Sequence, residues 1–142
     1  MTISARLSIV TLGVSHLDRS VAFYEALGWT RSSASSDGIS WFALTGAALG
    51  LFPIAELAKD AALPVGPGGF GGITLAINLE SEELVDAAMA TAVAAGGTAV
   101  KPPEHTGWGG YSGYFTDPDG YPWELAFNPF FTLGPDGALL LP

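Results

Sequence analysis

The sequence predicts a single α+β domain built from two copies of one βαβββ unit. Its length of 142 residues is that of one ordinary domain, long enough to bury about 68–70% of the surface of the unfolded chain without crosslinks. A pattern of one strand, one helix and three strands occurs twice in succession. The segment 48–53 also aligns without gaps to 124–129. We expect a first unit at about 7–53, a linker at 54–70, a second unit at about 71–129 and a tail at 130–142.

The first unit shows its elements through hydrophobic periodicity. Alternation over residues 8–14 predicts a strand covered on one side. Apolar residues at helical spacing from Leu17 to Leu27 predict a helix, which ends where Gly28 can adopt a left-handed cap. Turn signals at Asp37-Gly38 and Gly46 separate three further strands. These strands are expected at 29–35, 39–45 and 47–52.

The second unit repeats this order after a connection rich in Gly and Pro, which holds at most one short helix near 54–62. Residues 73–77 alternate as a strand, and Ser81 is a plausible N-cap for a helix that ends at Gly96-Gly97. Asp117–Gly120 predicts a tight turn between the last two strands. These three strands are expected around Val100, at 110–116 and at 121–128. The apolar tail should pack on the domain or on a second subunit.

Composition narrows the classes of partner. Five Lys and Arg residues stand against 14 Asp and Glu, for a formal net charge of −9, which repels phosphate backbones and anionic lipid heads. The chain has no cysteine, so disulfides and thiolate metal sites are excluded and a reducing compartment fits. No signal peptide or membrane-spanning run is evident. We expect a cytoplasmic protein with a small-molecule ligand and neither nucleic acid nor a membrane as partner.

Two segments carry a family likeness. VSHLDRSVAFYEALGW at 14–29 and WGGYSGYFTDPDGYPWELAFNP at 108–129 resemble the opening helix and the closing hairpin of the vicinal oxygen chelate superfamily, which includes glyoxalases, bleomycin-resistance proteins and extradiol dioxygenases. The resemblance implies two βαβββ modules that form a cup-shaped mixed sheet, with the helices on its outer face. It also implies a homodimer, in which modules pair within or between chains.

In metal-using relatives the first and last strands of each module supply one ligand apiece. By the resemblance these positions are Ile9, Ala48, Gly72 and Glu124 in this chain. A register shift of one residue would replace Ala48 by Leu49, with the same outcome. A divalent ion needs several N or O donors, and one carboxylate offers only weak binding. We therefore expect no metal and no cofactor, and the metal positions are interpreted as vestigial.

Glu124 is the strongest catalytic candidate, because strand alternation directs it into the cup. It can act as a general base or as an anchor for an amine or hydroxyl. Alternatively, it is bonded to a nearby Tyr or Trp and serves the fold. Tyr114 and, more weakly, His105 are the candidate acids. His105 is expected in a loop that rims the mouth of the cup, whereas His16 is interpreted as a helix-start residue.

A ligand-binding set is expected around the cup, since aromatic rings can stack on a flat or cationic molecule. Strand aromatics also belong to cores, and Trp123 is assigned there. The glycines between 66 and 72 do not form a phosphate loop, because no GK[ST] follows. The expected ligand-binding residues are Trp41, Phe52, Trp108, Tyr111, Tyr114 and Glu124.

Three functions remain open on the sequence, which does not decide whether the protein is an enzyme. The first is binding or sequestration of a small neutral or cationic, aromatic or amphipathic molecule, as in metal-free resistance proteins. The second is a metal-independent lyase, isomerase or epimerase that uses Glu124 as base with Tyr114 or His105 as acid. The third is a metal enzyme that combines His105 and Glu124 with a residue of a partner subunit.

Overall fold

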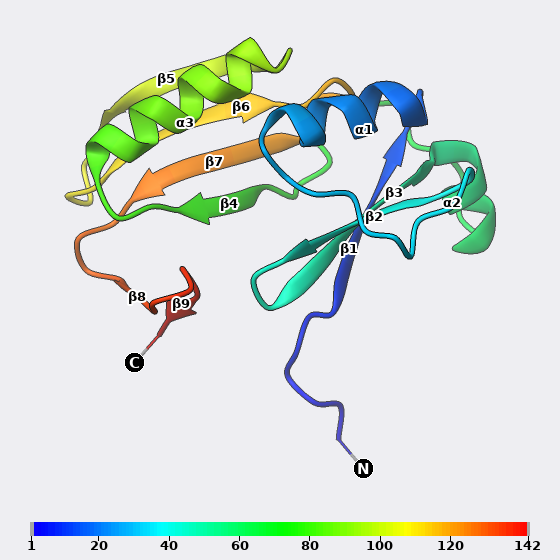
Figure 1. The fold of residues 1–142 in the computed structure, drawn as a ribbon, viewed down its shortest axis with the longest axis horizontal. Helices are drawn as coiled ribbons and strands as arrows, with labels where there is room; N and C mark the ends of the chain where they lie inside the picture. Colours follow the sequence, from blue (N-terminus) through cyan, green and yellow to red (C-terminus); the bar gives the residue numbers. More distant parts are fainter. Residues whose placement is uncertain (1, 142) are drawn as a thin grey trace.

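The computed structural model describes residues 2–141, and within them it contains three helices and nine strands in two successive modules (Figure 1). The elements run in the order β1 (Ile9–Val14), α1 (Leu17–Ala26), β2 (Ser40–Leu44), β3 (Ala47–Pro53), α2 (Ile54–Asp60), β4 (Leu75–Asn78), α3 (Glu82–Ala94), β5 (Thr98–His105), β6 (Tyr111–Thr116), β7 (Pro122–Phe127), β8 (Thr132–Leu133) and β9 (Leu139–Leu140). None of the helices in these residues is long and apolar enough to cross a bilayer.

Each module contributes one mixed sheet. The first has the strand order β1-β3-β2 and the second β4-β7-β6-β5. In both, the opening strand pairs in parallel with the closing strand, while the remaining pairs are antiparallel. Figure 1 shows α3 covering the second sheet and α1 on the same side of the molecule over the first. The α+β class and the mixed sheets with helices on their outer side are confirmed.

The strand expected at 29–35 is reduced to a single bridge between Arg31 and Phe42. The serines of this segment explain the difference. The hydroxyl of Ser32 accepts from the backbone of Ala34 at 3.1 Å, and that of Ser35 accepts from the backbone of Trp41 at 2.8 Å. Such local bonds compete with a strand ladder, so the first sheet has three strands where the second has four.

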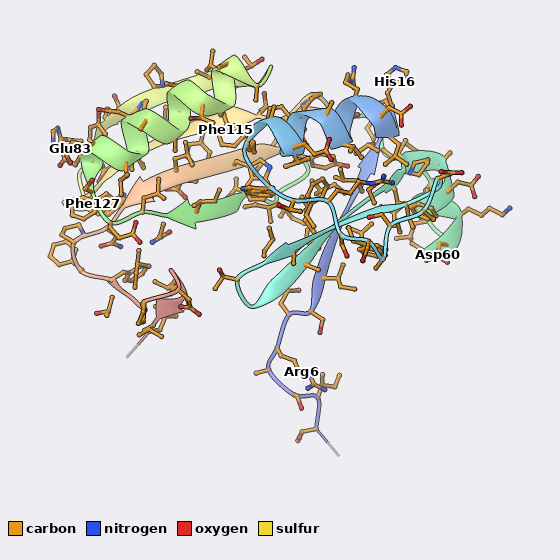
Figure 2. The ribbon with its side chains drawn as sticks, viewed as in Figure 1. Arg6, His16, Asp60, Glu83, Phe115 and Phe127 are labelled. Atoms are coloured by element: carbon orange, nitrogen blue, oxygen red, sulfur yellow. The ribbon has the colours of Figure 1, made fainter. Side chains whose placement is uncertain are left out.

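The hydrophobic core lies between the helices and the sheets. Alternating residues of the strands meet the apolar sides of α1 and α3, as the periodicity predicted. The residues between them point to the opposite side, which we call the open face of each sheet. The buried core members are Leu12, Val14, Phe23, Tyr24, Phe42, Leu49, Leu51, Val85, Met89, Ala92, Phe115, Trp123 and Leu125. In Figure 2 Phe115 lies beneath the helices, while His16 and Glu83 mark the exposed starts of α1 and α3.

A buried polar network joins α1 to the second module. Tyr24 is fully buried, and its hydroxyl donates to Asp117 at 2.7 Å and accepts from the Trp123 indole at 3.1 Å. Asp117 also accepts from the backbone amides of Asp119 and Tyr121. Burial raises the pKa of Asp117 above its usual value, and the bond from Tyr24 partly offsets this. The turn expected at Asp117–Gly120 therefore also holds the modules together.

The start of α1 is capped by the other module. His16 is the N-cap residue, but its side chain makes no capping hydrogen bond. Instead Asp119 accepts from the Ser15 backbone at 2.8 Å and from the Ser20 hydroxyl at 2.9 Å, and it pairs with Arg19 at 3.4 Å. A carboxylate at this position also suits the positive end of the helix dipole. In α3 the cap is local, as expected, since Ser81 accepts from Leu84.

Candidate functional site

Glu124 and Tyr114 lie side by side on the open face of the second sheet. They are register partners between β7 and β6, whereas Trp123 and Leu125 on either side of Glu124 are buried. Burial raises the pKa of the Tyr114 hydroxyl, and the adjacent Glu124 charge raises it further; the Thr74 hydroxyl lies close enough to interact with it as well. The site therefore presents a phenol beside a carboxylate, with Glu124 itself half-buried.

Neither Gly72 nor Thr74 belongs to the first strand of the second module, because β4 begins at Leu75. Gly72 lies outside β4, with a positive φ of 83° and an exposed backbone. By strand register Ala76, the partner of Glu124, corresponds to Ile9, the partner of Ala48. The spacing of seven residues to the helix N-cap, from Ile9 to His16, is instead matched by Thr74 and Ser81. The expectation for Gly72 is wrong because its Gly-rich surroundings carry no strand periodicity. The sequence analysis did not consider Thr74, whose hydroxyl lies near that of Tyr114.

The four metal positions do not fit a divalent ion. Ile9 and Ala48 are register partners on β1 and β3 and offer no donor atoms. The second module provides the Thr74 hydroxyl and the Glu124 carboxylate. Across residues 2–141 no three His, Asp or Glu side chains gather as metal ligands would. One carboxylate and one neutral hydroxyl are too few donors to replace the water around Zn²⁺, Ni²⁺ or Mn²⁺.

Trp41 and Phe52 belong to the open face of the first sheet. Trp41 is paired with Gly50, where an added Cβ would lie 2.6 Å from the Trp41 ring. The ring thus rests directly on the Gly50 backbone, which only glycine permits. Phe52 lies two residues after Gly50 and therefore on the same face of β3. Its register partner on β1 is Gly13, which is covered by Ile54 of α2. Both aromatics are half-buried.

Trp108 reaches the open face of the second sheet from the loop before β6. An added Cβ at Gly110 would lie 1.9 Å from the Trp108 ring, so the ring packs on the Gly110 backbone. Gly110 shares the alternation of Ser112 and Tyr114, which places this contact at the end of the same face. The indole remains 47% exposed.

His105 and Tyr111 lie on the helix side of the second sheet, contrary to the expectation for a site in the cup. The Tyr111 hydroxyl donates to Asp86 of α3 at 2.8 Å, and His105 contacts Glu82 of α3 at 3.0 Å. The two are register partners, with ring centroids 5.0 Å apart. The two register shifts in β5 cancel in alternation, so His105 lies on the same side of the sheet as Ala99, and it ends that strand instead of lying in a loop. His105 therefore cannot share a metal or a substrate with Glu124.

Lys101 is a residue of the open face that the sequence analysis missed. It is the register partner of Tyr114 on β5, so Lys101, Tyr114 and Glu124 form one row across three strands. Its amine pairs with Glu104 at 3.4 Å and is half exposed. The row combines a cation, a phenol and a carboxylate.

A further cavity lies elsewhere, in a groove between the two sheets. Its volume is about 920 Å³, and it is lined by β4, by the end of β2, by the segment after α1 and by residues 136–139. None of the expected ligand-binding residues lines it. Trp123, assigned to the core from sequence, is only 4% exposed and touches the groove at its edge.

The sequence and the fold correspond to a known family. Residues 6–125 match the family model described as the Glyoxalase/Bleomycin resistance protein/Dioxygenase superfamily. The chain belongs to this superfamily. Among the functionally curated proteins none matches the sequence.

Solved structures of the superfamily cover nearly the whole chain. A glyoxalase-related enzyme from Fulvimarina pelagi is 33% identical with a TM-score of 0.88, over 97% of this chain and 99% of that one. A glyoxalase/bleomycin resistance protein/dioxygenase from Nocardioides is 26% identical with a TM-score of 0.74, over 94% and 93% of the two chains. A family enzyme from Burkholderia phytofirmans PsJN, 23% identical with a TM-score of 0.76 over 87% and 98%, shares the fold.

Proposed function

We propose that the protein binds a small neutral or cationic, aromatic or amphipathic molecule without a metal, as a sequestering protein. The observation that carries this proposal is the open face of the second sheet, where the only carboxylate among the four metal positions lies beside Tyr114. A carboxylate attracts an amine or accepts from a hydroxyl, and nearby rings supply stacking surface. Trp108 lies at the end of this face.

We also propose that the protein forms a homodimer, which would bring the aromatics of the first module toward Glu124 of a second copy. No described contact joins Trp41 or Phe52 to Tyr114 or Glu124 within residues 2–141. Large apolar side chains are exposed near both ends of the chain, which is typical of a protein interface. The exposed set includes Ile3, Leu7, Ile9, Phe130, Phe131 and Leu141. Light scattering after gel filtration should give twice the chain mass of 14.6 kDa.

A thermal-shift panel of drugs and metabolites, with planar cations tested first, examines the binding proposal. A ligand at 100 times its Kd should stabilise the fold by about 2.7 kcal/mol, which corresponds to about 9 °C for a chain of this size. Glu124→Gln and Tyr114→Phe should reduce the shift. Glu83→Gln, on the exposed start of α3, provides the matched control. A panel with no shift, or a shift equal in all variants, would contradict the proposal.

The second candidate is a metal-independent lyase or isomerase in which Glu124 is the general base and Tyr114 the acid. The specific support is that both lie on one face in register and that Tyr114 stays protonated because its pKa is raised. Glu124→Gln keeps the shape of the side chain but removes its basicity. Turnover that survives this change with an unaltered kcat would exclude the mechanism.

A further inference from the structure

The groove between the sheets has the volume of a ligand site. Its volume of about 920 Å³ falls within the roughly 300–1,000 Å³ range of small-molecule pockets. One wall is strand β4, a second is the end of the β2–β3 hairpin, and the third is the C-terminal hairpin of β8 and β9. The Thr45 hydroxyl donates to the Asp136 carbonyl at 3.3 Å, so the two hairpins meet across it.

The groove walls are apolar in their middle. Trp29 is half-buried there, with its ring held edge-to-face at 5.6 Å from Trp123 and stacked at 5.4 Å from Tyr24. Leu44 and Leu139 face the cavity from the two hairpins. Because Leu139 is 43% exposed, a ligand that covers it would remove apolar surface from water.

The charge of the groove has one sign. Glu80 and Asp136 line it from opposite walls, and among its described lining residues there is no Lys, Arg or His. Asp136 uses one carboxylate oxygen to accept from Ala138 at 3.0 Å, which leaves the other oxygen for a ligand. A groove with two carboxylates on opposite walls and no positive side chain attracts a cation and repels an anion.

Strand β4 adds hydrogen-bonding groups to this wall. It pairs with β7 alone in the part of the chain described here, so its outer edge is open. The Leu79 amide donates to Ala126 of β7, and alternation therefore turns the backbone groups of Ala76 and Asn78 toward the groove. Unpaired amides and carbonyls at this edge can orient a ligand that carries N–H or O–H groups.

We infer that this groove is a second binding site, separate from the open face, which takes an amphipathic organic cation with an aromatic body. The aromatic part lies against Trp29 and the leucines, and the cationic nitrogen lies between Glu80 and Asp136. The groove adjoins the open face through β4, since Ala76 is the register partner of Glu124. The two sites are nevertheless lined by different side chains.

Ethidium is a suitable probe, because it is a planar cation whose fluorescence rises in an apolar site, and 8-anilinonaphthalene-1-sulfonate is the anionic comparison. We expect saturable ethidium binding that weakens with salt, and no comparable binding of the anion. The double variant Glu80→Gln/Asp136→Asn should weaken ethidium binding about tenfold, as expected for the loss of two partly exposed charge contacts. Asn at 136 can still accept from Ala138.

The matched control is Glu56→Gln/Asp60→Asn, which changes the net charge equally but lies on α2, at the far end of the molecule from Glu83 (Figure 2). It should leave ethidium affinity within about twofold of the parent, because neither carboxylate lines the groove and salt screens charges that do not contact the ligand. Ala43→Phe places a ring in the groove from an exposed position on β2 and should abolish binding while circular dichroism stays unchanged.

The inference would be overturned by an absence of saturable ethidium binding, by an equal loss of binding in the α2 control, or by full binding to a folded Ala43→Phe protein. Loss of binding in Glu124→Gln alone would place the probe on the open face and not in the groove, which supports the proposed function while rejecting this second site. An affinity that falls as the chain self-associates would show that a second copy fills the groove, and this also overturns it.

Discussion

Tyr24→Phe should destabilise the protein strongly, because it removes the central member of the buried network between α1 and the second module. The phenol donates to Asp117 at 2.7 Å and accepts from Trp123 at 3.1 Å. A hydrogen bond to a charged group is worth about 1.5–3 kcal/mol and a neutral one about 1 kcal/mol. The expected loss is therefore about 2.5–4 kcal/mol in the free energy of unfolding, or about 8–12 °C in Tm for this chain length.

Urea unfolding followed by circular dichroism measures this loss, with the m-value as a check on two-state behaviour. Tyr111→Phe is the control, because Tyr111 makes a similar bond to Asp86 at 2.8 Å but at the exposed surface. Its midpoint should stay close to that of the parent, since exposed polar contacts contribute little. Equal effects of the two substitutions would refute the reasoning that the Tyr24 network joins the modules.

Three further changes test other parts of the structure. Asp119→Ala should cost about 1–2 kcal/mol in urea unfolding, because it uncaps α1; a smaller loss than in exposed Asp18→Ala would contradict the capping role. Gly50→Ala should lower the free energy of unfolding by about 1–3 kcal/mol and shift the tryptophan fluorescence, since the added Cβ would displace the Trp41 ring. Gly38→Ala is the control: its added Cβ has free space, so stability and fluorescence should both stay unchanged. All four tyrosines have raised pKa values, chiefly through burial for Tyr24, Tyr114 and Tyr121 and through the bond to Asp86 for Tyr111. Phenolate absorbance at 295 nm should thus appear at higher pH in the folded than in the urea-unfolded protein, and stability should fall as pH rises above the ordinary tyrosine value of about 10; coincident titrations would contradict this.

The duplicated fold could be predicted because its signals are local. The helix from Leu17 ends near Gly28 as expected, and Ser81 caps α3 through its own side chain. The alternation of β7 placed Glu124 opposite the buried Trp123 and Leu125 correctly. Each of these features depends on residues that are close to it in the sequence.

The incorrect or missed predictions lie where contacts between residues distant in sequence, or an irregular backbone, determine the local structure. Two register shifts in β5 turn Lys101 onto the open face opposite Tyr114, and neither the composition nor the periodicity of that strand shows them. Asp119 caps a helix about 100 residues earlier in the chain, which a turn motif does not reveal. The groove is formed by three segments far apart in sequence, so no single motif marks it.

Metal analysis of the purified protein tests the central claim most directly. The chain should be purified without chelators, incubated with zinc, nickel, manganese and iron salts, passed over a desalting column and measured by mass spectrometry of the elements. Because Ile9 and Ala48 carry no donor atom and Glu124 is the only carboxylate among the metal positions, the account predicts far less than one ion per chain. A stoichiometric ion that is retained by the parent protein and lost in Glu124→Ala would contradict it.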